Sequence, residues 1–180
     1  MLGRIKHRDA SSDSDHIDWL ISQIDRVRPD LDTAGLSITG RVLRLATSIQ
    51  TTRAKLLEPL GLTVGDFDVL ATIRRAGEIT GSEISNAVMI TAGGITKRLD
   101  RLENRALITR TRDPNDRRST VITLTPDGKE SVDAAYDFVT TTESAFVSNT
   151  LDASEQRRTE QSLRALLRAT VDVISDHDEH

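Results

Sequence analysis

Apolar residues recur at helical spacing over most of the chain, and proline, glycine or polar residues end each run. The first predicted helix covers residues 16–27 and is ended by Pro29. The second begins after Ser37, a suitable N-cap, carries an apolar stripe over residues 38–49 and ends near Leu57. The N-terminal part of the chain is therefore expected to form two amphipathic helices.

The middle of the chain carries three helix signals in quick succession. Thr63 and Asp66 have the spacing of a capping box, which opens a helix that ends at Gly77. A short helix over about 81–88 comes next, and a further one over about 92–104 follows it.

A β-hairpin follows these helices. Ile108 leads into it, its tip is polar, and Val121–Leu124 is the strongest strand signal in the chain. Three closely spaced helices and a two-stranded hairpin predict a winged helix-turn-helix, with residues 81–88 and 92–104 as the helix-turn-helix.

Two further helices are predicted at the C-terminal end. Pro126 suits the first turn of a helix that runs to about Val147, and Asp152 caps the last one. The apolar residues of the last helix are expected to face inward: Leu163, Leu166, Leu167, Val171 and Ile174. The predicted fold is mainly α with a small β-hairpin wing, divided into a flexible tail (1–14), N-terminal helices (15–58), the winged helix-turn-helix (59–128) and C-terminal helices (129–180).

Composition narrows the possible classes of protein. A chain of 180 residues, 37% hydrophobic and 29% charged, suits one compact domain with an added layer of helices. It has no cysteine, which excludes a disulfide framework, a thiolate zinc site, a cysteine nucleophile and a thiol redox sensor. Residues 1–14 are polar and contain no apolar run long enough for a signal peptide or membrane span, which agrees with a cytoplasmic location.

Charge is distributed unevenly. Residues 97–118 contain eight basic and four acidic residues, so this segment carries +4 while the whole chain carries −4. A positive segment on an acidic body is typical of a protein that meets phosphate with one face only. A solvated charged face without a partner is the alternative.

The start of the second helix of the helix-turn-helix is the candidate for contact with DNA bases, because such helices enter the major groove near their N-terminal residues. Thr91 is the expected N-cap, and Gly93 and Gly94 fall in the first turn. The glycines either let backbone N–H groups approach phosphate or mark a loose helix start without a ligand. Three donors follow on the side expected to be exposed: Thr96, Lys97 and Arg98.

The hairpin tip carries a second cluster of candidates. Pro114 and Asn115 form a turn, and Asp116, Arg117 and Arg118 follow it. Adjacent arginines on a tip suit insertion into a narrow minor groove, and the carboxylate can hold one guanidinium in place. A charged tip that only keeps the hairpin soluble is the alternative.

Four segments together resemble the long signature of the MarR family, with its spacing intact: Leu99–Glu103, Leu107–Arg110, Asp113–Arg118 and Leu124–Gly128. The resemblance implies a winged-helix transcription regulator that binds double-stranded DNA as a homodimer through its first and last two helices. Repression would be relieved by a small ligand. The DNA-binding positions that it implies here are Thr91, Gly93, Gly94, Thr96, Lys97, Arg98, Asp116, Arg117 and Arg118.

Residues 67–77 and 28–32 further resemble the PecS-like, urate-responsive branch of this family. The resemblance implies that Trp19, Asp68, Arg75 and Arg110 bind the effector. An anionic purine suits a guanidinium, an aromatic wall and a carboxylate. Another anionic or aromatic metabolite remains open as the ligand, since many members of the branch carry the tryptophan where this chain has Ile24. Asp68 and Arg75 could equally form ordinary ion pairs on a helix face.

An enzyme is excluded at this point. The four histidines lie near the termini, and the chain shows neither a glycine-rich phosphate loop nor a nucleophile–base pair. No metal and no cofactor are expected. A winged helix used for contact with another protein remains the alternative function, although it would not require arginines on both the helix and the wing.

Overall fold

The computed structural model describes residues 14–88, 92–112 and 119–177, with the side chains of Ala92 and of residues 171–177 outside that description. Most of these residues are helical. The chain divides into two compact units, Met1–Lys55 and Leu56–His180, which are considered separately.

The first unit contains α1 (His16–Val27) and the main part of α2 (Ala34–Leu57). The predicted bounds of α1 are confirmed, and Asp15 and Asp18 form a capping box at its start. The prediction for the start of α2 was wrong, because this helix begins three residues before Ser37. The carboxylate of Asp32 accepts the N–H of Ala34 at 2.9 Å, which allows the earlier start, and Ser37 lies inside the first turn.

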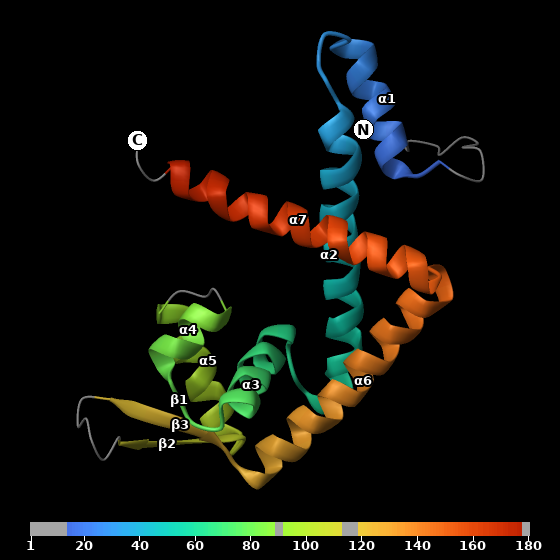
Figure 1. Cartoon of the computed structure of the whole chain (residues 1–180). Coiled ribbons are helices and arrows are strands. Elements are labelled where there is room, and N and C mark those ends of the chain that lie inside the picture. The colour runs from blue at the N-terminus through green and yellow to red at the C-terminus, as the bar shows by residue number, and fades with distance from the viewer. Residues whose placement is uncertain (1–13, 89–91, 113–118, 178–180) are drawn as a thin grey trace, which may run out of the picture. The chain divides into compact units, whose positions relative to one another are not determined.

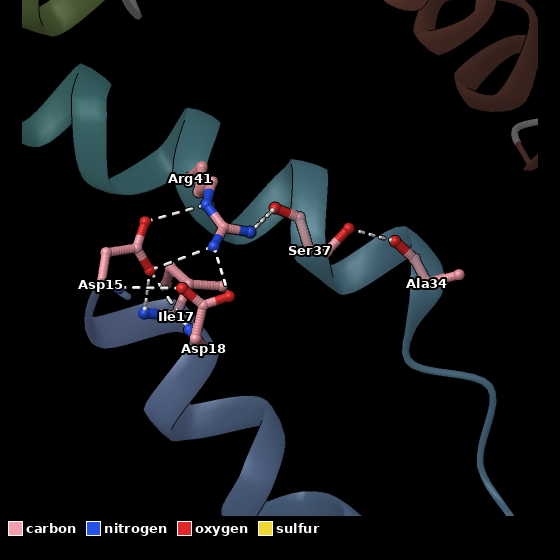
Figure 2. Close-up of polar contacts among 6 residues, drawn as sticks. All are labelled: Asp15, Ile17, Asp18, Ala34, Ser37 and Arg41. Carbon is pink, nitrogen blue, oxygen red and sulfur yellow. Dashed lines mark hydrogen bonds and ion pairs between the residues drawn. The ribbon is translucent and has the colours of Figure 1, made fainter. Parts of the chain in front are cut away.

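Arg41 joins α1 to α2 (Figure 2). Its guanidinium donates to the carboxylate of Asp15 at 2.8 Å and to that of Asp18 at 2.6 Å, and also to the backbone carbonyl of Ser37 at 2.7 Å. Beside this cluster, Ile17 is buried against Gly40, where a Cβ atom would lie 3.2 Å from the Ile17 side chain. Ion pairs and one close apolar contact therefore hold the two helices together.

The second unit starts with a short 3-10 helix, η1 (Glu58–Leu60), and continues with α3 (Val64–Ala76), α4 (Gly81–Val88) and α5 (Ala92–Asn104). Thr63 and Asp66 form the predicted capping box of α3, and Gly77 ends it in the left-handed region at φ 79°. All three helices were predicted within a residue or two. Figure 1 shows them gathered beside a small sheet.

The sheet has three strands, β1 (Ile79–Thr80), β2 (Ile108–Arg112) and β3 (Thr120–Leu124), in the order β1-β3-β2. β2 and β3 form the predicted antiparallel hairpin, with Ile108 opposite Leu124. The prediction of two strands was incomplete, because β1 pairs with the other side of β3. A strand of two residues has too short a pattern to be recognised in a sequence.

Two long helices complete the chain, α6 (Pro126–Thr150) and α7 (Ala153–His177). Thr125 caps α6 and Pro126 occupies its first turn, as predicted, although the helix continues three residues beyond Val147. The carboxylate of Asp152 accepts two N–H groups at the start of α7 and so caps it, also as predicted.

One core lies inside the second unit, between α3, α4, α5, the sheet and the first half of α6. Leu70, Ile84 and Leu102 are fully buried there. The expectation that Leu163, Leu166 and Leu167 face inward was wrong for the single chain, in which they are 38% to 68% exposed. The side chains of Val171 and Ile174 lie outside the described residues. No helix in the described part of the chain has the length and apolar character needed to cross a bilayer.

Candidate nucleic-acid interface

Helix α5 has one buried and one exposed side. Ile95, Leu99 and Leu102 point into the core, at 4%, 4% and 0% exposure. Gly93, Thr96 and Lys97 are exposed near the N-terminal end, and Gly94 is partly exposed. The spacing of apolar residues along α5 determines this orientation, since a straight helix that buries Ile95 and Leu99 must turn Thr96 and Lys97 toward solvent.

An ion pair to a buried carboxylate fixes α5 against α3. The guanidinium of Arg101 on α5 donates to the carboxylate of Asp66, whose side chain is 2% exposed. Burial acts to raise the pKa of Asp66, but the hydrogen bonds from Arg101 and Thr63 outweigh it and hold that pKa below its ordinary value. Asp66 is therefore a charged residue that both caps α3 and binds α5.

Two more arginines hold α5 at its other end. Arg105 donates to the backbone carbonyl of Gly61 at 2.7 Å and to that of Leu60 at 3.3 Å. Arg110 on β2 pairs with Asp100 at 2.7 Å and with Glu103 at 3.4 Å, both on α5. Part of the basic segment predicted from the sequence therefore positions the helix through contacts within the chain.

Arg98 occupies an unusual place. Its guanidinium lies directly over Gly65 in the first turn of α3, in the space that a Cβ atom of any other residue would fill. Its Nη1 is buried and makes no hydrogen bond within the described part of the chain. The side chain is half-buried, so Arg98 is not presented on the exposed side of α5 in the way that Thr96 and Lys97 are.

The remaining DNA-binding candidates cannot be placed. Thr91 and the wing residues Asp116, Arg117 and Arg118 lie outside the described residues. The strands that lead to the wing are described, and Arg112 is exposed at the end of β2.

The candidate effector residues fall in both units. Trp19 lies on α1 in the first unit, 39% exposed, with its ring stacked on His16 at a centroid distance of 5.3 Å. In the second unit, Asp68 and Arg75 lie on α3 and Arg110 on β2. The structure thus places three of the four residues in one compact unit.

Sequence reasoning missed several residues of this region. It assigned no contact to Asp66 beyond the capping box, and none to Arg101, Arg105 or Tyr136. Tyr136 on α6 accepts a hydrogen bond from Arg75 at 3.1 Å. The partners lie 35 to 61 positions apart in the chain, so no local pattern could have shown these contacts.

Metal binding finds no support in the described ranges, where no three histidine or acidic side chains lie close enough together to hold an ion. The fold and the orientation of α5 instead define a winged helix-turn-helix protein, a class that binds DNA with the second helix of the motif.

Comparison with known proteins gives the family. The family model described as "MarR family" matches residues 62–120. The chain is 38% identical over 112 residues to the HTH-type transcriptional regulator PecS of Dickeya dadantii, a match that covers 61% of this chain and 68% of that protein. The fold of this chain resembles that of a mutant E. coli MarR in complex with operator DNA, with a TM-score of 0.66 and 26% identity over 80% of this chain and 97% of that one. The S. aureus MepR–DNA complex shares the fold alone, with a TM-score of 0.67 and 23% identity over 73% of this chain and 97% of that one.

The chain belongs to the MarR family of DNA-binding transcription regulators. The predicted family and the predicted winged-helix fold are both confirmed. Members of this family regulate transcription and are not enzymes, which agrees with the exclusion made from the sequence.

Proposed function

We propose that this chain is a repressor that binds a near-palindromic operator as a homodimer and leaves it when a small anionic or aromatic ligand binds. One observation carries the proposal. Helix α5 buries Ile95 and Leu99 and exposes Thr96 and Lys97, so its N-terminal half faces outward as a recognition helix requires.

The residues at the DNA surface would have different roles. Lys97 and Thr96 contact base edges or phosphates in the major groove, with Thr91 beside them. Arg98 would join them only when its guanidinium leaves its place over Gly65. Gly93 and Gly94 let the backbone approach a phosphate at the positive end of the helix. On the wing, Arg117 enters the neighbouring minor groove with Arg118 beside it, and the carboxylate of Asp116 orients the wing.

In the first step of the test, fragments of the source genome that bind the protein are isolated. The affinity of the protein for such a fragment is then measured by fluorescence anisotropy at several salt concentrations. Lys97→Ala is expected to weaken binding about tenfold or more. Lys129→Ala is the control, since Lys129 is also an exposed lysine on a helix of the same unit. Equal affinities of the two variants would show that α5 is not the recognition surface.

The alternative function is a winged helix that contacts another protein. The salt dependence of DNA binding distinguishes it from the proposed function. Affinity for phosphate falls steeply as salt rises, because bound cations are released from DNA, while apolar contacts respond little. Retention on non-specific DNA that is insensitive to salt would favour the protein-contact module.

The homodimer is supported by apolar side chains left exposed on the helices of residues 15–58 and 129–180. Ile38, Leu43 and Leu45 on α2 are 45% to 70% exposed, and Leu163 and Leu167 on α7 are also exposed. A dimer in sedimentation experiments, and half-sites about 10 base pairs apart in a footprint, are the expected results. Protection of a single half-site by a monomer would contradict the dimer.

The effector would bind through Trp19, Asp68, Arg75 and Arg110, and urate is the first compound to test. Arg110 is bonded to Asp100 and Glu103 on the recognition helix, so an anion that attracts this guanidinium would weaken the hold of β2 on α5. Release of the complex is measured while urate, xanthine and salicylate are added. No release by urate would remove the purine and leave the DNA-binding function in place. The proposed location is the cytoplasm, where such an operator is found.

A further inference from the structure

Arg75 is held in place by two hydroxyl groups from different elements. Its Nη1 donates to the hydroxyl oxygen of Tyr136 on α6 at 3.1 Å. Its Nη2 donates to the hydroxyl oxygen of Thr72, one turn earlier on α3, at 3.0 Å. Both contacts lie inside the second unit.

These partners are uncharged, unlike those of three other arginines of the second unit. Arg74 pairs with Asp133, Arg101 with Asp66 and Arg110 with Asp100. Each of those guanidinium groups is neutralised by a carboxylate. The partners that the structure describes for Arg75 are both neutral, so its position is fixed while its charge remains available.

Both hydroxyl groups are themselves fixed. A hydroxyl has one proton to donate, and Thr72 uses its proton for the carbonyl of Asp68 at 2.8 Å. Tyr136 directs its proton to the carbonyl of Ala71 at 3.4 Å, and its ring packs edge-on against Phe67 at a centroid distance of 5.3 Å. The lone pairs of the two oxygens are therefore left to accept from Arg75.

We propose that Tyr136 and Thr72 are positioning residues that hold Arg75 as the receptor for the carboxylate or other anionic group of the effector. This inference rests on the proposed effector response and extends it to two residues outside the set taken from the family. Two of the five N–H donors of the guanidinium are used in these contacts, and the others can bind an anion. Because Arg75 is already ordered, the anion does not bear the entropic cost of immobilising a long side chain.

The test compares two probes with the same ring, salicylate and its neutral amide salicylamide, by calorimetric titration of the free protein. The wild type is expected to bind the anion more tightly. Tyr136→Phe keeps the packing against Phe67 but removes the acceptor, and it should lose about tenfold in affinity for salicylate, as expected for a hydrogen bond to a charged group. Its affinity for salicylamide should stay within about twofold. Thr72→Val should behave in the same way.

Thr150→Val is the matched control. Thr150 lies on α6 and makes the same kind of hydroxyl-to-carbonyl contact within its helix as Thr72, at 2.7 Å to the carbonyl of Phe146, but the structure describes no guanidinium bonded to it. It should bind both probes as the wild type does. A wild type without preference for the anion would overturn the proposal, and so would a Tyr136→Phe variant that weakens equally toward both probes, since this indicates a structural role only.

The titration is independent of DNA. If the chain bound no operator, the proposed function would fail while the salicylate preference still reported on Arg75. Conversely, operator affinity without ligand is expected to be the same in Tyr136→Phe and the wild type, since Tyr136 lies on α6 and not on the recognition helix.

Discussion

The carboxylate of Asp66 is shared between the start of α3 and the recognition helix. It accepts the backbone N–H of Thr63 at 3.0 Å and the hydroxyl of Thr63 at 2.7 Å, and it also accepts the guanidinium of Arg101. The side chain of Asp66 is almost fully buried, whereas that of Arg101 is half-exposed. The orientation of α5 is thus tied to the cap of α3 through one carboxylate.

Arg101→Met is expected to lower the free energy of unfolding by about 1–3 kcal/mol, because it leaves a buried carboxylate without its cation. Urea denaturation measures this. Arg158→Met is the control, since the exposed Arg158 donates to the hydroxyl of Ser154 within its own helix, at 3.2 Å, and pairs with no carboxylate in the described part of the chain. Equal stabilities of the two variants would mean that Asp66 does not need Arg101.

Stability is expected to fall at acid pH through Asp66. Burial acts to raise its pKa, but the bonds from Arg101 and Thr63 lower it below the ordinary value of 3.8. The folded state therefore binds fewer protons than the unfolded state, so this stabilisation is present above about pH 4 and is lost as pH falls through the folded pKa. Urea denaturation at several acid pH values should show a smaller pH dependence for Asp66→Asn than for the wild type. An unchanged dependence would exclude Asp66 as its source.

Gly93→Ala is expected to separate stability from DNA binding. Among the described residues, nothing outside the helix's own backbone lies within 4 Å of a Cβ atom built at this exposed position in α5, so alanine should raise the free energy of unfolding by up to about 1 kcal/mol. Operator affinity should fall, because the added methyl group keeps a phosphate away from the backbone. Gly35→Ala is a close control, since Gly35 is also the second residue of its helix and also lies in open space. Unchanged operator affinity in Gly93→Ala would assign the glycine to a loose helix start.

Gly65→Ala is expected to displace the guanidinium of Arg98 from α3. The clash is with the flexible end of a side chain, so the free energy of unfolding should fall by no more than about 1 kcal/mol. A guanidinium released toward solvent can reach one further phosphate, which would steepen the salt dependence of DNA binding by about 0.9 in the logarithmic slope. The double variant Gly65→Ala, Arg98→Ala should not show this steeper salt dependence. A strongly destabilised Gly65→Ala protein would mean that Arg98 cannot leave its place.

Arg41→Met is expected to release the start of α1 from α2. The guanidinium holds Asp15 and Asp18 together, and without it the contact of Ile17 with Gly40 remains (Figure 2). Hydrogen exchange should become faster in α1 and stay unchanged in α3 and α5. Arg44→Met, with an exposed arginine one turn further along α2, is the control. Slow exchange in α1 of the Arg41 variant would show that apolar packing alone holds the helix.

Local features of the chain were predictable because the residues that form them are close in sequence. The capping box at Thr63, the cap at Asp152 and the proline after Thr125 each act within one helical turn, so the starts of α3, α6 and α7 could be inferred from them. The start of α2 was predicted wrongly because both Asp32 and Ser37 are suitable capping residues. In the structure the carboxylate of Asp32 accepts the N–H of Ala34, so the helix begins before Ser37.

The amino-acid sequence by itself determined the order of the helices, the winged helix and the side of α5 that faces outward, since periodicity and caps are local properties. Only the tertiary structure decided what each arginine does. Arg101, Arg105 and Arg110 are engaged in holding the recognition helix, Arg98 lies over Gly65, and Arg75 is held by uncharged oxygens. The charge of a guanidinium is the same in every case, but its availability depends on partners far away in the chain, which only folding brings within hydrogen-bonding distance.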